Sequence, residues 1–125
     1  MFEATFTITA QVESDGQGQH VFRVRKHSDP VNDDGLLSLL ITIYEQDVLR
    51  TLRSGDDLRV YVRLDLPPRE IEKMLHFRED GQFEGEGLAE PTRDLHPLIA
   101  SVFEYYRPHV QPGDVFTISF QVQRS

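Results

Sequence analysis

The sequence predicts one α+β domain spanning residues 1–125, and three observations indicate this fold class. Several segments alternate apolar and polar residues with a period of two, which is typical of strands that have one face in water. Other segments repeat apolar residues at helical spacing. The chain has 125 residues, of which 38% are hydrophobic and 27% charged, and this size and balance suit a single hydrophobic core.

The first two predicted strands form a hairpin. Residues 2–12 carry apolar side chains at every even position and polar ones at every odd position. A glycine-containing polar turn occupies residues 14–18, and residues 20–27 are again extended, with Arg23 and Arg25 opposite the apolar positions. Because the two strands follow each other across a short turn, we expect them to pair antiparallel.

A helix is predicted after this hairpin. Pro30 ends the extended segment, and the Asp and Asn residues that follow are good helix N-caps. Apolar residues then recur at helical spacing as far as Arg53. The stretch from Leu36 to Tyr44 is rich in Leu and Ile, so a buried strand before a shorter helix is the alternative interpretation.

Residues 58–66 alternate most strictly and predict a third strand. Pro67 and Pro68 end it and favour a helix start, so we predict a short helix from Ile71 to about Arg78, closed by the Asp-Gly pair at residues 80–81. The stretch between Gly81 and Pro91 has no sustained period and is predicted to be a loop, with a brief strand around Phe83.

The last two elements are a helix and a strand. Apolar spacing predicts a helix that starts within residues 94–97 and is cut by Pro108, and residues 116–122 alternate as a strand. The predicted order is therefore β-β-α-β-α-α-β, with a four-stranded, mostly antiparallel or mixed sheet and all helices on its apolar face. This order also permits a β-grasp-like topology, although the last three residues lack the paired glycines of a conjugated tag.

Composition restricts the function classes. The chain has no cysteine, which excludes disulfides and thiol nucleophiles and suits a cytoplasmic location. No apolar stretch approaches the ~18 residues of a membrane span. Thirteen basic and twenty-one acidic residues give a net charge of −8, which disfavours nucleic acid as a partner and leaves a protein partner as the expectation.

No motif points to a metal or a cofactor. The five histidines include no pair at the i,i+4 spacing of a zinc helix, and no phosphate-binding glycine loop or nucleophile elbow occurs. We therefore expect no metal site, no cofactor and no catalytic residue. The oligomeric state is left open.

The candidate site is the polar face of the predicted sheet. Arginine and tyrosine, which are enriched at binding hot spots, gather on it in an otherwise acidic chain. The alternative interpretation is that long arginine side chains merely solvate an open sheet. The candidate partner-binding residues are Arg23, Arg25, Arg59, Tyr61 and Arg63.

These observations favour a non-catalytic protein-interaction domain of the adaptor, inhibitor or immunity type, or a subunit of an assembly. It would use the arginine and tyrosine face or an unpaired sheet edge. The alternative is a small enzyme or ligand-binding domain whose pocket lies under the loop between Gly81 and Pro91, with His76 and His96 among its polar groups.

Overall fold

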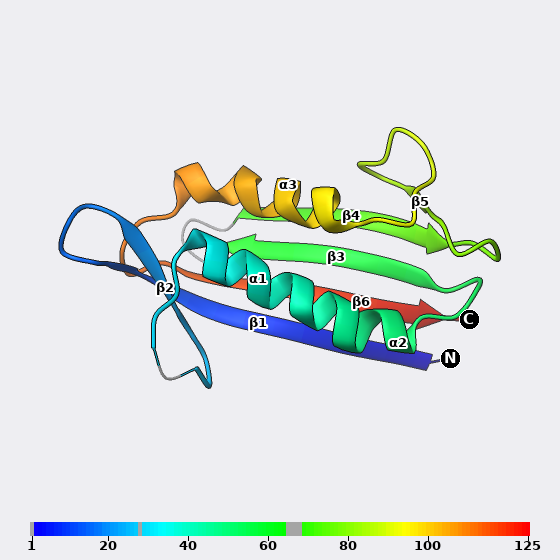
Figure 1. The fold of residues 1–125 in the computed structure, drawn as a ribbon, viewed down its shortest axis with the longest axis horizontal. Coiled ribbons are helices and arrows are strands. Elements are labelled where there is room, and N and C mark those ends of the chain that lie inside the picture. Colours follow the sequence, from blue (N-terminus) through cyan, green and yellow to red (C-terminus); the bar gives the residue numbers. More distant parts are fainter. Residues whose placement is uncertain (1, 28, 65–68) are drawn as a thin grey trace.

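A six-stranded antiparallel sheet forms the frame of the protein, and the helices cover one of its faces (Figure 1). The structure, a computed structural model, describes residues 2–27, 29–64 and 69–125. The strand order is β2-β1-β6-β3-β4-β5. The strands are β1 (Phe2–Ser14), β2 (His20–Val24), β3 (Asp57–Leu64), β4 (Arg69–Phe77), β5 (Phe83–Gly85) and β6 (Val115–Arg124).

The α+β class, the antiparallel sheet and the placement of helices on one face are confirmed, but the prediction of four strands in the order β-β-α-β-α-α-β was wrong. All described strand pairs are antiparallel, so the sheet is not mixed. A β-grasp topology, which pairs its first and last strands in parallel, does not fit either, because β1 and β6 run antiparallel. The last helix brings the chain back so that β6 enters the sheet between β1 and β3.

The segment predicted as a helix from Ile71 to Arg78 is the strand β4. It pairs along its length with β3, from Arg69 opposite Leu64 to His76 opposite Asp57. The predicted helix start at residues 67–68 lies outside the described residues. The Asp-Gly pair belongs to a turn into β5, where Arg78 donates its backbone N–H to the Gln82 carbonyl at 2.8 Å. The brief strand predicted around Phe83 is confirmed as β5.

The stretch from Leu36 to Tyr44 is helical, so the alternative of a buried strand was wrong. The helix α1 (Asp33–Ile43) continues through a π-helical turn, η1 (Tyr44–Val48), into α2 (Leu49–Thr51). Asn32 caps its start by accepting a hydrogen bond from the Gly35 N–H at 2.8 Å. The second helix, α3 (His96–Tyr106), runs into a 3-10 turn, η2 (Arg107–His109), as Pro108 leads to expect. No helix in the described part of the chain is long and apolar enough to cross a membrane.

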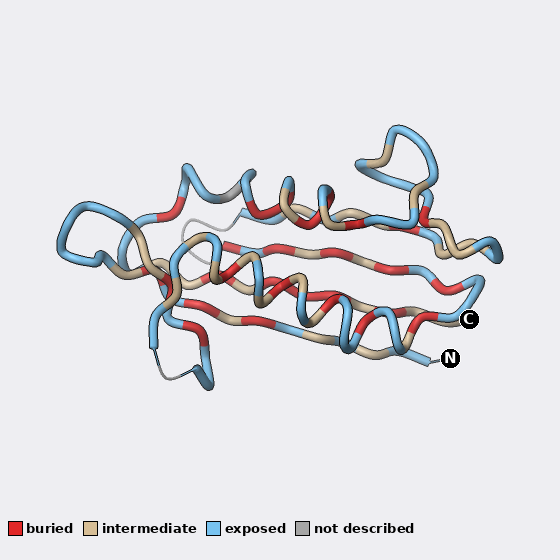
Figure 2. Tube along the Cα trace, in the orientation of Figure 1, coloured by how far each residue is buried: buried red, intermediate tan, exposed pale blue. Residues whose placement is uncertain are grey.

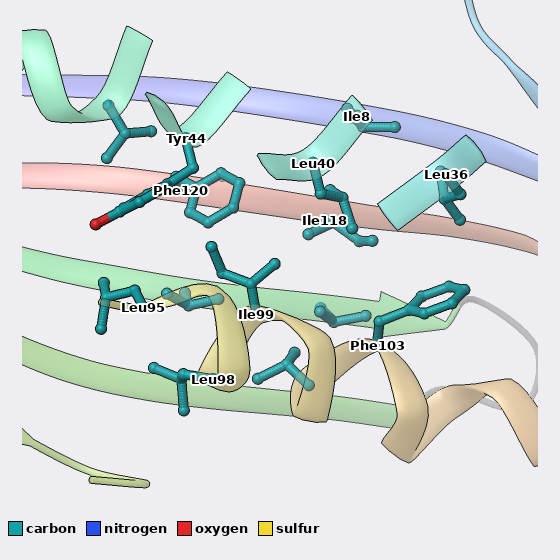
Figure 3. Close-up of a cluster of buried hydrophobic side chains, with 14 of the residues drawn as sticks. Ile8, Leu36, Leu40, Tyr44, Leu95, Leu98, Ile99, Phe103, Ile118 and Phe120 are labelled. Carbon is teal, nitrogen blue, oxygen red and sulfur yellow. The ribbon is translucent and has the colours of Figure 1, made fainter. Parts of the chain in front are cut away.

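The core lies between the helices and the sheet. Figure 2 shows buried positions alternating with less buried ones along the strands, and Figure 3 shows side chains of the helices, among them Leu40 and Ile99, gathered over the sheet. Tyr44 lies at the centre, only 2% exposed, with its ring 6.3 Å from that of Phe120. Burial raises the pKa of its hydroxyl, and that hydroxyl has no hydrogen-bond partner among the described residues.

One buried ion pair ties the end of β6 to the end of the first helix. Asp56 is 1% exposed and accepts from the Arg124 guanidinium through both carboxylate oxygens, each at 2.8 Å. It also accepts from the Arg53 backbone N–H at 2.8 Å. These bonds, led by the Arg124 contact, hold the pKa of Asp56 below its ordinary value. The same guanidinium lies 4.3 Å from the centre of the Phe2 ring.

Candidate functional site

The sheet face without helices contains the predicted binding residues. Across the sheet, Thr9, Thr117, Arg63 and Glu70 form one row, and Thr7, Ser119, Tyr61 and Glu72 form the next. Arg59 lies one row further on, opposite Gln121. On β2, Arg23 pairs with Gln11 on this same face. The alternation thus places these side chains on the face that the helices leave uncovered.

Most of these arginines are already paired within the protein. Arg59 contacts Glu72 at 2.7 Å and Gln121 at 3.0 Å, and its guanidinium carbon lies 4.3 Å from the centre of the Tyr61 ring. Arg23 donates to both carboxylate oxygens of Glu13, at 2.7 and 3.2 Å.

Arg63 and Tyr61, the other two candidate residues on β3, also interact with an acidic residue of β4. Arg63 lies 3.9 Å from Glu70. Partial burial raises the pKa of Tyr61, and a hydrogen bond to Glu70 adds to the effect. Because β4 supplies Glu70 and Glu72, the centre of the face is a network of compensated charges. A partner would have to replace those internal bonds.

Arg25 differs from the other four, because it lies where β2 ends. Its backbone N–H donates to the Thr9 carbonyl at 3.0 Å, the last such contact between the two strands. Lys26 follows with φ 70°, in the left-handed region that side chains other than glycine rarely adopt. This turn, closed by the His27 N–H on the Val24 carbonyl, leads the chain away from β1.

The early end of β2 leaves the outer edge of β1 open from Phe2 to Ile8. β2 pairs only with residues 10–14 of β1, whereas β6 pairs with residues 2–11 on the other side. In Figure 1 this part of β1 forms the lower margin of the sheet. Two backbone contacts show which way the groups of β1 point. Val12 bonds the turn before β6, on the inner side of β1, whereas Thr9 bonds Arg25, on the outer side.

Backbone N–H and C=O groups point to the same side at every second residue of a strand. Even residues of β1 therefore direct these groups to β6, and odd residues direct them outward. Glu3, Thr5 and Thr7 thus carry outward N–H and C=O groups, and no described residue bonds them.

The other sheet edges are covered or charged. Val31 exchanges two backbone hydrogen bonds with Phe22 and so covers β2, at 2.7 and 2.9 Å. Beyond β5, the outer part of β4 reads Arg-Glu-Ile-Glu-Lys, and charged side chains of this kind deter edge pairing. The open part of β1 reads Phe-Glu-Ala-Thr-Phe-Thr-Ile, with Glu3 as its one charge and no proline. It therefore lacks the protection that edge strands usually have.

A hollow of about 360 Å³ adjoins this open edge. It lies beside the point where β2 ends and turns away from β1. The turn contributes Arg25, Lys26 and His27 to its lining. The strands and α1 contribute Thr7, Ile8, Thr9, Val24, Leu39 and Ile43. At the far end of the same edge, Phe2 is 40% exposed, and its ring contacts protein on the side of the Arg124 guanidinium.

A larger and more open hollow, about 720 Å³, lies between the start of α1 and the end of α3. The arginine in its lining, Arg107, is already paired: it contacts Asp33 at 2.8 Å and Glu104 at 3.1 Å. Asn32 at its wall is engaged in capping α1. This hollow is therefore a surface depression whose arginine is held by acidic residues of the protein itself.

The loop between Gly81 and Pro91 does not join the two histidines into one site among the described residues. His76 contacts Asp57 at 3.0 Å, and His96 contacts Glu45 at 2.9 Å. Neither histidine lines the hollow beside β1, the hollow between α1 and α3, or two smaller hollows in the described part of the chain. The loop is anchored instead by Phe83, which is 1% exposed and packs on Phe77 with ring centres 4.8 Å apart.

Sequence reasoning named a sheet edge only in general terms and did not locate it. A signal was present: from a turn at residues 14–18, a second strand that ends at residue 27 is too short to reach the first residues of the chain, so an unpaired segment of β1 was to be expected. Comparison of the chain with protein-family models, curated proteins and solved structures found no match in any of the three.

Proposed function

We propose that this protein is a non-catalytic interaction domain that binds an extended polypeptide segment as an added strand on the outer edge of β1. One observation carries the proposal: the edge from Phe2 to Ile8 is open, nearly uncharged and free of proline. Added strands gain affinity from main-chain hydrogen bonds and specificity from pockets for alternate side chains. The outward groups of Glu3, Thr5 and Thr7 offer the first, and the adjoining hollow offers the second.

The arginine and tyrosine face is the second candidate surface of the same function. Binding there would compete with the Arg59–Glu72 and Arg23–Glu13 pairs. Binding at the edge would instead satisfy backbone groups that have no partner among the described residues. The edge is therefore the surface that the geometry supports better.

The test is affinity capture from an extract of the source cell with wild type and two variants of one residue. Thr5→Pro removes the outward N–H, and because that N–H does not face β6, the fold should lose about 1 kcal/mol or less. Thr5→Val keeps the N–H and the branched shape, so it is the matched control. We expect wild type and Thr5→Val to retain the same partner and Thr5→Pro to lose it.

A double variant separates the edge from the face. Arg59→Glu combined with Arg63→Glu reverses charge at the centre of the face and leaves the edge untouched. Loss of the partner with this variant, together with full capture by folded Thr5→Pro, would place binding on the face and refute the edge. Thermal melts of all variants confirm that each is folded.

A further inference from the structure

Resting on the proposed function, we infer that the strand added to β1 is the β1 strand of a second copy of this chain, in a two-fold symmetric dimer. The two sheets would join into one continuous sheet across a β1–β1 seam. The inference rests on three features of the edge: the direction of its backbone groups, the fit of Phe2 to the hollow, and the placement of Glu3 and Arg25.

The backbone defines one register. Two copies of a strand can pair antiparallel about a two-fold axis that passes through a pair of identical residues. If Thr5 faces Thr5 of the other copy, Glu3 faces Thr7, and each such pair exchanges both backbone hydrogen bonds. Every outward N–H and C=O of Glu3, Thr5 and Thr7 is then used in both copies. The paired segment ends with Phe2 opposite Ile8, and Arg25 already occupies the next position opposite Thr9.

This register directs an exposed aromatic ring to an apolar hollow. Phe2 and Ile8 are both even residues of β1, so their side chains are on the helix-covered face of the sheet. Phe2 of one copy, opposite Ile8 of the other, would enter the hollow formed by Ile8, Val24, Leu39 and Ile43. The hollow, about 360 Å³, has room for a phenylalanine side chain. By symmetry the contact occurs twice.

Local charge favours the same arrangement despite the net charge of −8. Glu3 of one copy would lie opposite Thr7 of the other copy, whose Arg25 lies opposite Thr9. Glu3 and Arg25 would therefore be two residues apart along the edge of β1 and on the same face of the sheet, within reach of a long side chain. The part of the hollow lined by Arg25, Lys26 and His27 thus lies near Glu3, the one acidic residue of the paired segment of the other copy. Charges elsewhere are screened beyond about 8 Å at physiological salt.

Sedimentation velocity of the purified protein, from micromolar to millimolar concentration, tests the inference. We expect a monomer–dimer equilibrium. Thr5→Lys and Thr5→Glu each place like charges face to face on the axis and should raise the dimer Kd at least about fivefold. An equimolar mixture of the two variants should restore the dimer. Thr7→Lys is the matched control, because it faces Glu3 of the other copy and should leave the Kd unchanged or lower it.

Two further variants test the hollow. Phe2→Ala should raise the Kd about tenfold or more, because two buried rings are lost. Tyr105→Ala removes a similarly exposed aromatic ring from α3, which lies over β3 rather than β1, and should have no effect. Circular dichroism confirms folding of each variant.

A wild-type protein that stays monomeric over the whole range overturns the inference, and so does a Thr7→Lys variant weakened as much as Thr5→Lys. If the pure protein is monomeric while capture from extract still depends on the Thr5 N–H, the occupant is a strand of another protein. That result refutes the dimer and leaves the proposed function standing. If the pure protein is monomeric and folded Thr5→Pro captures the same partners as wild type, the dimer and the proposed function both fail.

Discussion

Replacing Asp56 by asparagine should destabilise the protein by about 2–3 kcal/mol. The side chain of Asp56 is 2% exposed and accepts three hydrogen bonds, two of them from the Arg124 guanidinium. Asparagine offers one acceptor oxygen, and its NH2 group would face a donor on either Arg124 or Arg53. One charge-assisted bond of about 1.5–3 kcal/mol is thereby lost. Arg124 is one-quarter exposed, so its charge regains some water and the cost stays below that of a fully buried pair.

Urea denaturation at neutral pH, analysed by linear extrapolation, measures this change in the free energy of unfolding. Asp57→Asn is the matched control, because the neighbouring carboxylate is half exposed and its ion pair is with His76, also half exposed, so its loss should cost under about 0.5 kcal/mol. Equal effects of the two substitutions, or an Asp56→Asn variant as stable as wild type, would refute the reasoning.

The pH dependence follows from the sign of the shift. Because the pKa of Asp56 is lower in the folded than in the unfolded protein, its contribution is complete above the unfolded value of about 3.9 and is lost as pH falls toward the folded value. The stability difference between wild type and Asp56→Asn should therefore be constant from pH 5 to 7 and shrink below about pH 4.

Substitutions of Tyr44 and Gly85 test the core and the end of β5. Tyr44→Phe should stabilise the protein by about 1 kcal/mol, since it removes a buried hydroxyl that has no hydrogen-bond partner among the described residues. Tyr44→Ala should cost about 3–5 kcal/mol. A calorimetric melt in which Tyr44→Phe unfolds at a lower temperature than wild type would show that the hydroxyl has a partner such as a buried water. Gly85→Ala should cost well over 2 kcal/mol, because φ is 138° and an added Cβ would lie 2.5 Å from the Met74 carbonyl oxygen. Gly16→Ala, which also has positive φ but open space around it, should cost only about 1–2 kcal/mol, and equal losses in urea denaturation would contradict this account of the turn.

The strands with strict alternation could be predicted because no helical spacing competes with their period. β1, β3 and β6 are of this kind. β4 could not be predicted in the same way, since Ile71, Met74 and Leu75 also fit one face of a helix. Its pairing with β3 decides the structure there, and such long-range pairing is not visible in a local pattern.

Because β4 was predicted as a helix, only part of the candidate site could be predicted from the sequence. Alternation on β2 and β3 correctly indicated which arginines share the open face. Their partners Glu70 and Glu72 come from β4, so the compensation of charge on that face could not be predicted while β4 was interpreted as a helix. The open edge depends on where β2 ends, and that depends on the left-handed backbone of Lys26, a residue type that does not signal such a turn.

Backbone amide exchange along β1, measured residue by residue by NMR, tests the central claim most directly. In dilute protein, the amides of Thr5 and Thr7 should exchange fast because they face outward, and those of Phe6 and Ile8 should exchange slowly because they face β6. When the edge is occupied, by raising the protein concentration or by adding a captured partner, the amides of Thr5 and Thr7 should become protected while those of β4 do not change. If Thr5 and Thr7 exchange at the same fast rate under all these conditions, no strand is added to this edge and the account is wrong.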